Sequence, residues 1–361
     1  MSEYVRPPFN RDVWAVLGMP VDNVTVGEAA ALVERAVETR ERLSFVTPNV
    51  NWLVRALKDP AAMRQIVNAD LSLADGAPVV WLARRLGMPL RERVAGSDLF
   101  DHLRYDDRPD AAPIRVFFFG GRDGAAEAAC AALERENGRL VPAGWYNPGF
   151  GDVASMSATE IQDKINAARP DFILVSLGAA KGQAWIEHNL DALEAPVLAH
   201  LGAVVDFVAG TIRRAPGWVS RIGLEWVWRI FAEPSLWKRY WSDGTALLLL
   251  GLKRLRLLSA VSKSDQNKNL IVTTRDDQIA LSGAATLANR DKLRSAFSAA
   301  GDQNRDLTLS FHGADALDAA AIGQIRMLEK TLYARGHILH IEAGPTLGNA
   351  LEAAGFQARA A

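Results

Sequence analysis

The sequence predicts an α/β fold built on a mostly parallel β-sheet, followed by a helical appendage and a smaller α/β unit. Three apolar stretches predict buried strands of the sheet: Val116–Phe119, Asp171–Leu177 and Pro196–Leu201. Continuous apolar runs are typical of strands that helices cover on both faces. Stretches with helical periodicity separate these strands, and this alternation indicates parallel pairing through crossover helices.

The composition is that of a globular protein with a large core. Hydrophobic residues make up 49% of the 361 residues and charged residues 23%, and this length favours two domains or a domain with a module. The net charge of −1 argues against nucleic-acid binding. The single cysteine, Cys130, excludes an intramolecular disulfide. The first residues lack the apolar segment of a signal peptide, and no run of about 18 apolar residues predicts a membrane span.

The other elements of the first half follow from periodicity and capping signals. Thr25 and Glu28 have the spacing of a capping box at a helix start. In chain order we expect a strand at Val13–Leu17, a helix from Thr25 to about Glu41, a strand at Ser44–Thr47, helices at Trp52–Ala56 and Pro60–Asn68, a strand at Leu71–Ala74, and helices from Ala77 to about Arg85, from near Leu99 and from about Ala184.

Asp75 is the main candidate for a catalytic residue. It follows the strand Leu71–Ala74, and Gly76 then leads into a helix that begins at Ala77. Open α/β sheets bind ligands at the carboxyl ends of their strands, and a carboxylate there can act as a general base. The alternative is that Asp75 only caps the helix, because Asp is a preferred N-cap residue.

Glycines follow the three apolar strands, where they permit close approach of a ligand. Gly178 and Gly202 end two of them, and Gly120, Gly121 and Gly124 follow the other. A glycine turn that exposes amides at a helix start can hold a phosphate. The spacing is neither that of a Walker A loop nor GxGxxG, so a plain strand–helix turn is the alternative.

Basic and aromatic residues are concentrated after about Thr211. From there to Lys263 the chain has ten Lys or Arg, three acids and five of its ten tryptophans. This mixture favours helices in a membrane interface, where anionic lipid attracts the cations, and we expect contact through residues 216–258. The alternative is an arm packed on the core with buried aromatics and solvated charges.

A separate α/β pattern follows a polar linker at residues 262–268. It covers residues 269–361, so the expected organisation is a core at 1–215, an appendage at 216–261, the linker and this unit. Its predicted elements are strands at Leu270–Thr274 and Gln278–Ser282, a helix at Leu287–Ala299, a strand at Leu307–Phe311, a helix at Ala319–Arg335, a strand at Ile338–Ala343 and a helix at Thr346–Ala354.

Several motifs, taken together, resemble the WecG/TagA/CpsF glycosyltransferases, glycosyltransferase family 26. The resemblance covers about Val13–Tyr240, and it fits a Rossmann-like core. The residues that carry it are Thr47-Pro48-Asn49, Ala74-Asp75-Gly76, Val94–Asp98, Phe119-Gly120-Gly121, Pro170-Asp171, Leu177-Gly178, Gly202–Gly210, Arg214-Ala215-Pro216, Gly223–Trp226, Arg229 and Glu233-Pro234.

This resemblance implies an activity and a location. The family transfers a hexose or N-acetylhexosamine from a UDP-sugar with inversion, and requires no metal or other cofactor. Its acceptors are typically polyprenyl-diphosphate-linked saccharides at the cytoplasmic face of a bacterial membrane, used in surface and exopolysaccharide synthesis. The resemblance therefore implies a cytoplasmic protein that is peripheral at the inner face of the cell membrane.

The resemblance also implies roles for residues at the strand ends. Asp75 takes the role of the base. Without a metal, amides and cations must stabilise the leaving diphosphate. The basic and aromatic stretch after about Thr211, called the arm below, supplies Arg214, Arg221, Arg229 and Arg239. The other implied substrate contacts are Thr47, Asn49, Asn51, Gly76, Gly120, Gly121, Gly178, Lys181, Gln183, Gly202 and Asp206.

One motif departs from the family pattern, Gly-x-Pro-Lys-Gln-Glu-x-Trp. The stretch Gly178–Trp185 lacks the proline, and it has Gly182 for the glutamine and Gln183 for the glutamate. This change leaves the donor sugar open. It also motivates a second hypothesis, a catalytically degenerate scaffold that binds a nucleotide sugar or lipid and acts through its C-terminal unit.

The C-terminal unit resembles a STAS domain. The resemblance rests on the strand Leu307–Phe311, on Asp318–Gly323 and on Leu351–Phe356. The family's loop often carries a phosphorylatable Ser or Thr after the Asp, but Ala319 has no hydroxyl, so that switch is excluded. The resemblance implies a protein partner or self-association, and the alternative is a domain that only stabilises the enzyme.

Overall fold

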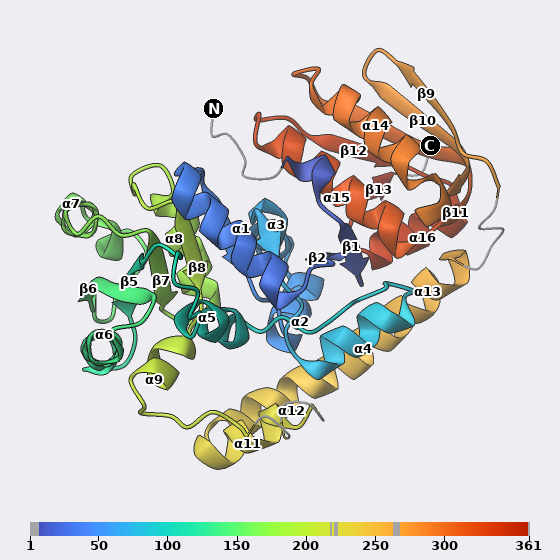
Figure 1. Ribbon diagram of the computed structural model, residues 1–361. Helices are drawn as coiled ribbons and strands as arrows, with labels where there is room; N and C mark the ends of the chain where they lie inside the picture. Colours follow the sequence, from blue (N-terminus) through green and yellow to red (C-terminus); the bar gives the residue numbers. More distant parts are fainter. Residues whose placement is uncertain (1–6, 217–218, 220–222, 263–267, 360–361) are drawn as a thin grey trace.

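The computed structural model describes residues 7–216, 219, 223–262 and 268–359 (Figure 1). Its largest sheet has six strands in the order β4-β3-β8-β7-β5-β6. Every pairing in this sheet is parallel. The predicted α/β core with a parallel sheet is therefore confirmed.

The core elements alternate along the chain. The strands are β3 (Leu43–Val46), β4 (Leu71–Ser72), β5 (Ile114–Gly120), β6 (Leu140–Tyr146), β7 (Phe172–Ser176) and β8 (Val197–His200). The helices are α1 (Val26–Thr39), α2 (Val50–Lys58), α3 (Pro60–Asn68), α4 (Ala77–Arg85), α5 (Gly96–Arg104), α6 (Ala125–Glu136), α7 (Thr159–Ala167), α8 (Ala179–Asn189) and α9 (Val204–Val208), with short 3-10 turns at Pro8–Asn10 and Ser155–Ser157.

Helices cover both faces of the six-stranded sheet, as the apolar runs predict. In β5, Val116 and Phe118 pack with α1, α5, α6 and α9, whereas Phe117 and Phe119 pack on the opposite face with α7 and α8. The capping box at the start of α1 is confirmed, because Thr25 Oγ1 accepts from the Glu28 N–H and the Glu28 carboxylate accepts from the Thr25 N–H.

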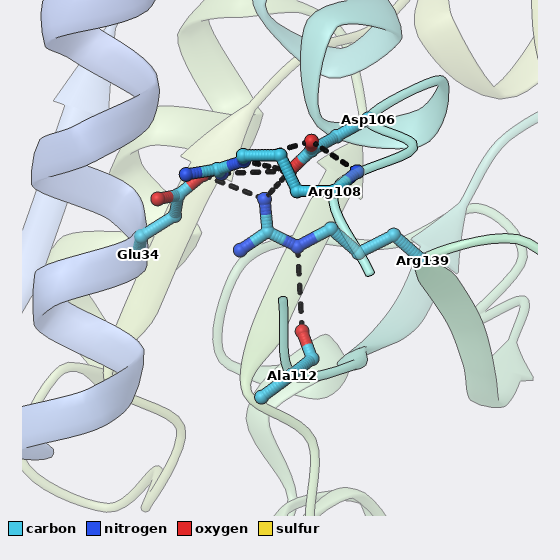
Figure 2. A network of polar contacts seen from close by, with 5 residues as sticks. All are labelled: Glu34, Asp106, Arg108, Ala112 and Arg139. Carbon is cyan, nitrogen blue, oxygen red and sulfur yellow. Dashed lines mark hydrogen bonds and ion pairs between the residues drawn. The ribbon is translucent and has the colours of Figure 1, made fainter. Parts of the chain in front are cut away.

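Ion pairs join the loops at the amino-terminal edge of this sheet (Figure 2). Arg139, just before β6, pairs with Glu34 of α1 at 2.6 Å and donates to the Ala112 carbonyl at 3.3 Å. Arg108 pairs with Asp106 at 2.7 Å and with the same Glu34. These contacts hold the edge opposite to the one where parallel sheets bind ligands.

A two-stranded hairpin, β1 (Val13–Val16) and β2 (Met19–Asp22), lies between the core and the C-terminal elements (Figure 1). The sequence predicts β1 but not β2. The turn consists of Leu17 and Gly18 with φ of 51° and 88°. Asn-Gly is the usual signal for a two-residue turn with positive φ at both positions, so Leu-Gly gives little sign of the hairpin.

The appendage is a run of helices: α11 (Glu225–Ala232), α12 (Leu236–Ala246), a π-helical turn (Leu247–Gly251) and α13 (Leu252–Ser262). Beyond it, the C-terminal module, residues 268–359, has a five-stranded sheet in the order β13-β12-β11-β10-β9. Its elements are β9 (Ile271–Arg275), β10 (Gln278–Ala285), α14 (Arg290–Gly301), β11 (Leu307–Leu317), α15 (Ala319–Tyr333), β12 (Leu339–Glu342), α16 (Pro345–Ala353) and β13 (Ala358–Arg359), with a 3-10 turn at Leu287–Asn289.

The module shares a hydrophobic core with the N-terminal half of the chain. One buried cluster contains Val13 and Leu17 of the hairpin region, Leu53 of α2, and Ile322 and Leu351 of the module. The module therefore does not stand apart as an independently packed unit, although its run of elements matches the predicted order with β13 added.

Several boundaries differ from the sequence prediction. Helix α8 begins at Ala179 rather than near Ala184, and α5 begins at Gly96 rather than near Leu99. Glycines at the starts of both segments were weak helix signals because glycine disfavours helices. The prediction also missed β6, whose mixed burial gives no clear alternation, as well as α7 and β13.

We expect the Arg11→Met substitution to lower the free energy of unfolding by about 3–5 kcal/mol. Arg11 forms a fully buried ion pair with Asp22 at 2.7 Å, so its loss leaves a buried carboxylate without its cation. Urea unfolding measures the effect. Arg35→Met is the control, because Arg35 is 59% exposed and its pair with Glu41 is long, at 3.9 Å. Equal losses in the two variants would contradict the prediction.

Candidate functional site

The carboxyl-terminal edge of the six-stranded sheet gathers most of the residues singled out by the sequence. Asp75 follows β4, Thr47 and Asn49 follow β3, Gly202 follows β8, Gly178 follows β7, and Gly120 ends β5. Parallel pairing places all these strand ends at one edge. The strand order β4-β3-β8-β7-β5 sets Asp75 beside Thr47 and Asn49 and away from Gly120.

Asp75 does not cap helix α4. The N-cap residue is Gly76, with a φ of 84°, and no side chain caps this helix. The backbone N–H of Asp75 donates to the Pro48 carbonyl at 3.2 Å, which fixes the position of Asp75 beside the loop after β3. The capping interpretation is therefore wrong, and the Asp75 side chain is available for another role.

Arg93 joins Asp75 to two further carboxylates. Its Nη1 lies 4.0 Å from Asp75 Oδ1 and 2.8 Å from Glu225 Oε2, and its Nη2 lies 2.7 Å from Asp98 Oδ2. The segment that carries Arg93 runs beside the end of β4, because the Val94 N–H donates to the Ala74 carbonyl at 2.9 Å.

The surroundings of Asp75 raise its pKa to about 7, mainly because burial disfavours the charged carboxylate. Arg93 and Arg229 lower this pKa, whereas the charges of Glu225 and Asp98 raise it. About a quarter of the Asp75 side chain, 24%, remains exposed. Asp75 can therefore exchange a proton near neutral pH, as an efficient general base does.

Arg214 is already engaged by carboxylates. It forms ion pairs with Asp98 and Asp101 and donates to Ser97 Oγ at 3.1 Å. Its guanidinium also lies over the Phe207 ring, 5.8 Å from the ring centre. These contacts connect α5 to the start of the arm. The two carboxylates largely balance the charge of Arg214.

The polar residues after β3 have structural partners. Asn49 caps α2, because its Oδ1 accepts from the backbone N–H groups of Asn51 and Trp52. Asn51 Nδ2 donates to Asp243 Oδ2 at 3.1 Å and so connects α2 to α12 of the arm. Thr47 is partly exposed beside Gly96, at the start of α5.

The glycines have local structural roles that the sequence did not reveal. A Cβ on Gly120 would collide with Leu177 and the Ser176 carbonyl. The Gly121 N–H already donates to that carbonyl at 2.8 Å, so it is not directed at a ligand. Ser176 Oγ donates to the Gly202 carbonyl at 2.8 Å, and Gly178 is the N-cap of α8.

The altered motif lies in the first turns of α8 rather than in a loop. Lys181 Nζ donates to the Gly151 carbonyl at 2.7 Å, and Gln183 is 1% exposed. A Cβ on Gly182 would overlap the buried imidazole of His200, which ends β8. Burial lowers the pKa of His200 to about 4, so this ring is neutral.

The remaining candidates differ in position. Arg229 lies over the Phe207 ring at 6.0 Å and acts electrostatically on Asp75. Arg239 lies over the ring of Tyr240 at 5.5 Å, on exposed α12. Asp206 is buried and accepts from the Thr211 hydroxyl. Arg221 lies outside the described residues.

Sequence reasoning missed Arg93 and assigned no role to Glu225. Arg93 directly precedes the Val94–Asp98 motif, and that adjacency was the available signal. Within the described residues, no cluster of three or more His, Cys, Asp or Glu has the geometry of a metal site. None of the helices in the described part of the chain is long and apolar enough to cross a membrane.

The fold and site define an α/β protein with a partly buried acid at the carboxyl-terminal edge of its parallel sheet. Residues 14–260 match the Glycosyl transferase WecG/TagA/CpsF family. The N-acetylglucosaminyldiphosphoundecaprenol N-acetyl-beta-D-mannosaminyltransferase of Bacillus spizizenii is 33% identical over 195 residues, which cover 54% of this chain and 73% of that protein. The chain therefore belongs to the WecG/TagA/CpsF glycosyltransferase family.

Proteins of the same name from two other species are also similar. The Bacillus subtilis protein is 28% identical over 55% of this chain and 73% of its own length. The Staphylococcus aureus protein is 27% identical over 62% of this chain and 85% of its own length. The family match ends at residue 260, so the C-terminal module lies beyond it.

We expect Asp75→Asn to stabilise the fold increasingly as the pH rises. The folded-state pKa of about 7 exceeds the ordinary value of 3.8, so the folded state binds more protons and loses stability between these two pH values. The Tm difference between the variant and the wild type should grow by a few degrees from about pH 5 to about pH 8. Asp110→Asn, on an exposed loop, is the control, and a pH-independent difference for Asp75→Asn would refute the assignment.

Proposed function

We propose that this chain is a metal-independent, inverting glycosyltransferase that moves a hexose or N-acetylhexosamine from a UDP-sugar to a polyprenyl-diphosphate-linked saccharide. The observation that carries the proposal is the position of Asp75 at the carboxyl edge of a parallel sheet, beside Arg93. Burial there raises the pKa of Asp75 to about 7. The names of the relatives support the acceptor class, since they specify an N-acetylglucosaminyl-diphosphoundecaprenol.

In this proposal Asp75 is the general base. Its carboxylate accepts the proton of the acceptor hydroxyl while the hydroxyl oxygen attacks the anomeric carbon of the donor. The bond from that carbon to the diphosphate oxygen breaks on the opposite face, which gives inversion. A pKa near neutrality suits this role, because the carboxylate fraction and the driving force for proton transfer are then both substantial.

Arg93 positions the base rather than the phosphate. It is bound to Glu225 and Asp98 and lies 4.0 Å from Asp75. As Asp75 gains a proton, Arg93 keeps its two other carboxylate partners, so little reorganisation is needed. Arg229, on α11, is our candidate for stabilising the leaving diphosphate, because its charge already acts at this site.

The arm is our candidate for the membrane-facing surface of a cytoplasmic, peripheral enzyme. Several of its apolar side chains are exposed: Phe231 is 81% exposed, Trp241 70% and Leu249 80%. The packed-arm alternative expected these aromatics to be buried. Exposed Lys238 and Arg239 lie on α12, and exposed Lys253 and Arg256 lie on α13. Exposed cations and apolar side chains along one run of helices suit an anionic lipid interface.

We expect Asp75→Asn to lower the transfer rate by about 10²- to 10⁴-fold. UDP release is measured with a panel of UDP-sugars, a polyprenyl-diphosphate-linked N-acetylglucosamine acceptor and liposomes. Asp110→Asn should retain wild-type turnover. Retained transfer by Asp75→Asn would disprove the base assignment. UDP-sugar binding without turnover by the wild type would favour the scaffold hypothesis that the altered Gly182 and Gln183 motif raises.

We expect the double substitution Trp241→Glu and Leu249→Glu to weaken sedimentation with acidic liposomes at least tenfold, because it places charge on an apolar surface. Tyr105→Glu, at an exposed position at the end of α5, should sediment with the liposomes like the wild type. High salt should also weaken the wild-type binding. Unchanged sedimentation of the double variant would refute the proposed membrane-facing surface.

A further inference from the structure

Strand β4, which leads to Asp75, is short and lies at the edge of its sheet. It pairs with β3 only at Leu71 and Ser72. On its outer side, Leu73 forms a bridge with Asp22 of β2, and the Ser72 N–H donates to Asp22 Oδ2 at 2.8 Å. The hairpin β1–β2 therefore completes the edge of the sheet and fixes the strand that leads to Asp75.

This hairpin depends on the C-terminal module. A two-stranded hairpin is marginal alone and needs a helix or further strands against it. Helix α15 packs directly on β1, at a point where a Cβ on Gly323 would overlap the Val13 carbonyl. At the hairpin tip, Gly18 contacts the Ala354 carbonyl, and Arg326 Nε donates to the Gly18 carbonyl at 3.0 Å.

A second contact joins the module to the two residues directly before β4. Lys330 of α15 is 4% exposed, and its Nζ donates to the Ala69 carbonyl at 2.9 Å and to Asp70 Oδ1 at 2.8 Å. The other oxygen of Asp70 accepts from the Ser44 N–H of β3 at 2.9 Å. One buried lysine of the module thus fixes the starts of β3 and β4, the strands that lead to Thr47 and Asp75.

We propose that the C-terminal module acts in cis as the support of the catalytic edge, with Arg326 and Lys330 as positioning residues for Asp75. Its role is to hold the hairpin β1–β2 and strand β4 in place. This inference rests on the proposed function in one respect, the identification of Asp75 as the base.

The buried state of the first turn of α15 supports this role over recruitment of a partner through that turn. Asp318 is 8% exposed, and Ala319, Ala320 and Ala321 are also buried. The Asp318 carboxylate caps the helix by accepting from the Ala321 N–H. The turn that carries the STAS resemblance is therefore covered in this chain.

The test compares two glycine-to-alanine substitutions inside helices of the module. Gly323→Ala places a methyl group against the Val13 carbonyl, whereas Gly348→Ala in α16 meets no neighbour closer than 3.8 Å. Both gain the same intrinsic helix propensity, so a loss at position 323 alone reports the docking contact. Lys330→Met, with Lys292→Met on α14 as its control, provides a second pair of variants.

Hydrogen exchange of the full-length protein gives the first readout. In Gly323→Ala and Lys330→Met we expect faster exchange at residues 13–22 and 71–75, with the controls unchanged. The bonds concerned include Leu73 N–H to Val46 and Asp75 N–H to Pro48. Increased exchange confined to residues 268–359, or equal to that of the controls, would overturn the proposal, even if the protein shows no transferase activity.

The kinetics of the proposed sugar transfer give the second readout. We expect kcat to fall about 10- to 100-fold, because small displacements of a catalytic group have large effects. The apparent pKa of the kcat profile should also fall as Asp75 becomes more hydrated among Arg93, Glu225, Asp98 and Arg229. A kcat and a pH profile like those of the wild type would overturn the positioning role, whereas a purely stabilising module would change only Tm.

Discussion

Arg93 holds together carboxylates from three separate segments, and the layout of the site depends on these ion pairs. Asp75 comes from the end of β4, Asp98 from the first turn of α5, and Glu225 from the first turn of α11. Three acids in one partly buried space repel one another, so the cation is required to bring them together. Burial, supported by the charges of Glu225 and Asp98, raises the pKa of Asp75 despite the nearby Arg93. The helical segment that begins at Glu225 is therefore joined to the sheet edge at Asp75 through Arg93.

The fold was largely predictable because it follows from local patterns. Apolar runs such as Val116–Phe119 indicate strands covered on both faces, and the capping box at Thr25 marks a helix start. The hairpin strand β2 was not predictable in this way. Its turn forces Leu17 to a positive φ, and that conformation is sustained by burial among residues far away in the sequence. Tertiary packing decides this element, and no local signal reports it.

The position of Asp75 at the carboxyl-terminal edge of the sheet was predictable, whereas the partners of the side chains around it were not. Motifs located the strand ends, but they did not reveal which side chains were already engaged. Asn49 caps a helix, and Arg214 is balanced by Asp98 and Asp101. Arg93 was missed because a single arginine beside a loop motif has no distinguishing pattern. Its importance arises from three partners spread over more than a hundred residues. Gly182 likewise becomes interpretable only when His200 is found in the space that a side chain would fill.

The contact between Gly18 and Arg326 has a consequence for synthesis on the ribosome. The two residues are 308 positions apart. The turn of the hairpin can therefore form this contact only after α15 has been synthesised. Domains generally fold from the N-terminus as they emerge, but here one of the earliest strands is completed by one of the last helices. Until then the β4 edge lacks its cover, and exposed strand edges invite pairing with other chains. Nascent chains that stall before α15 should therefore be the aggregation-prone species, and they should need a chaperone more than the finished protein does.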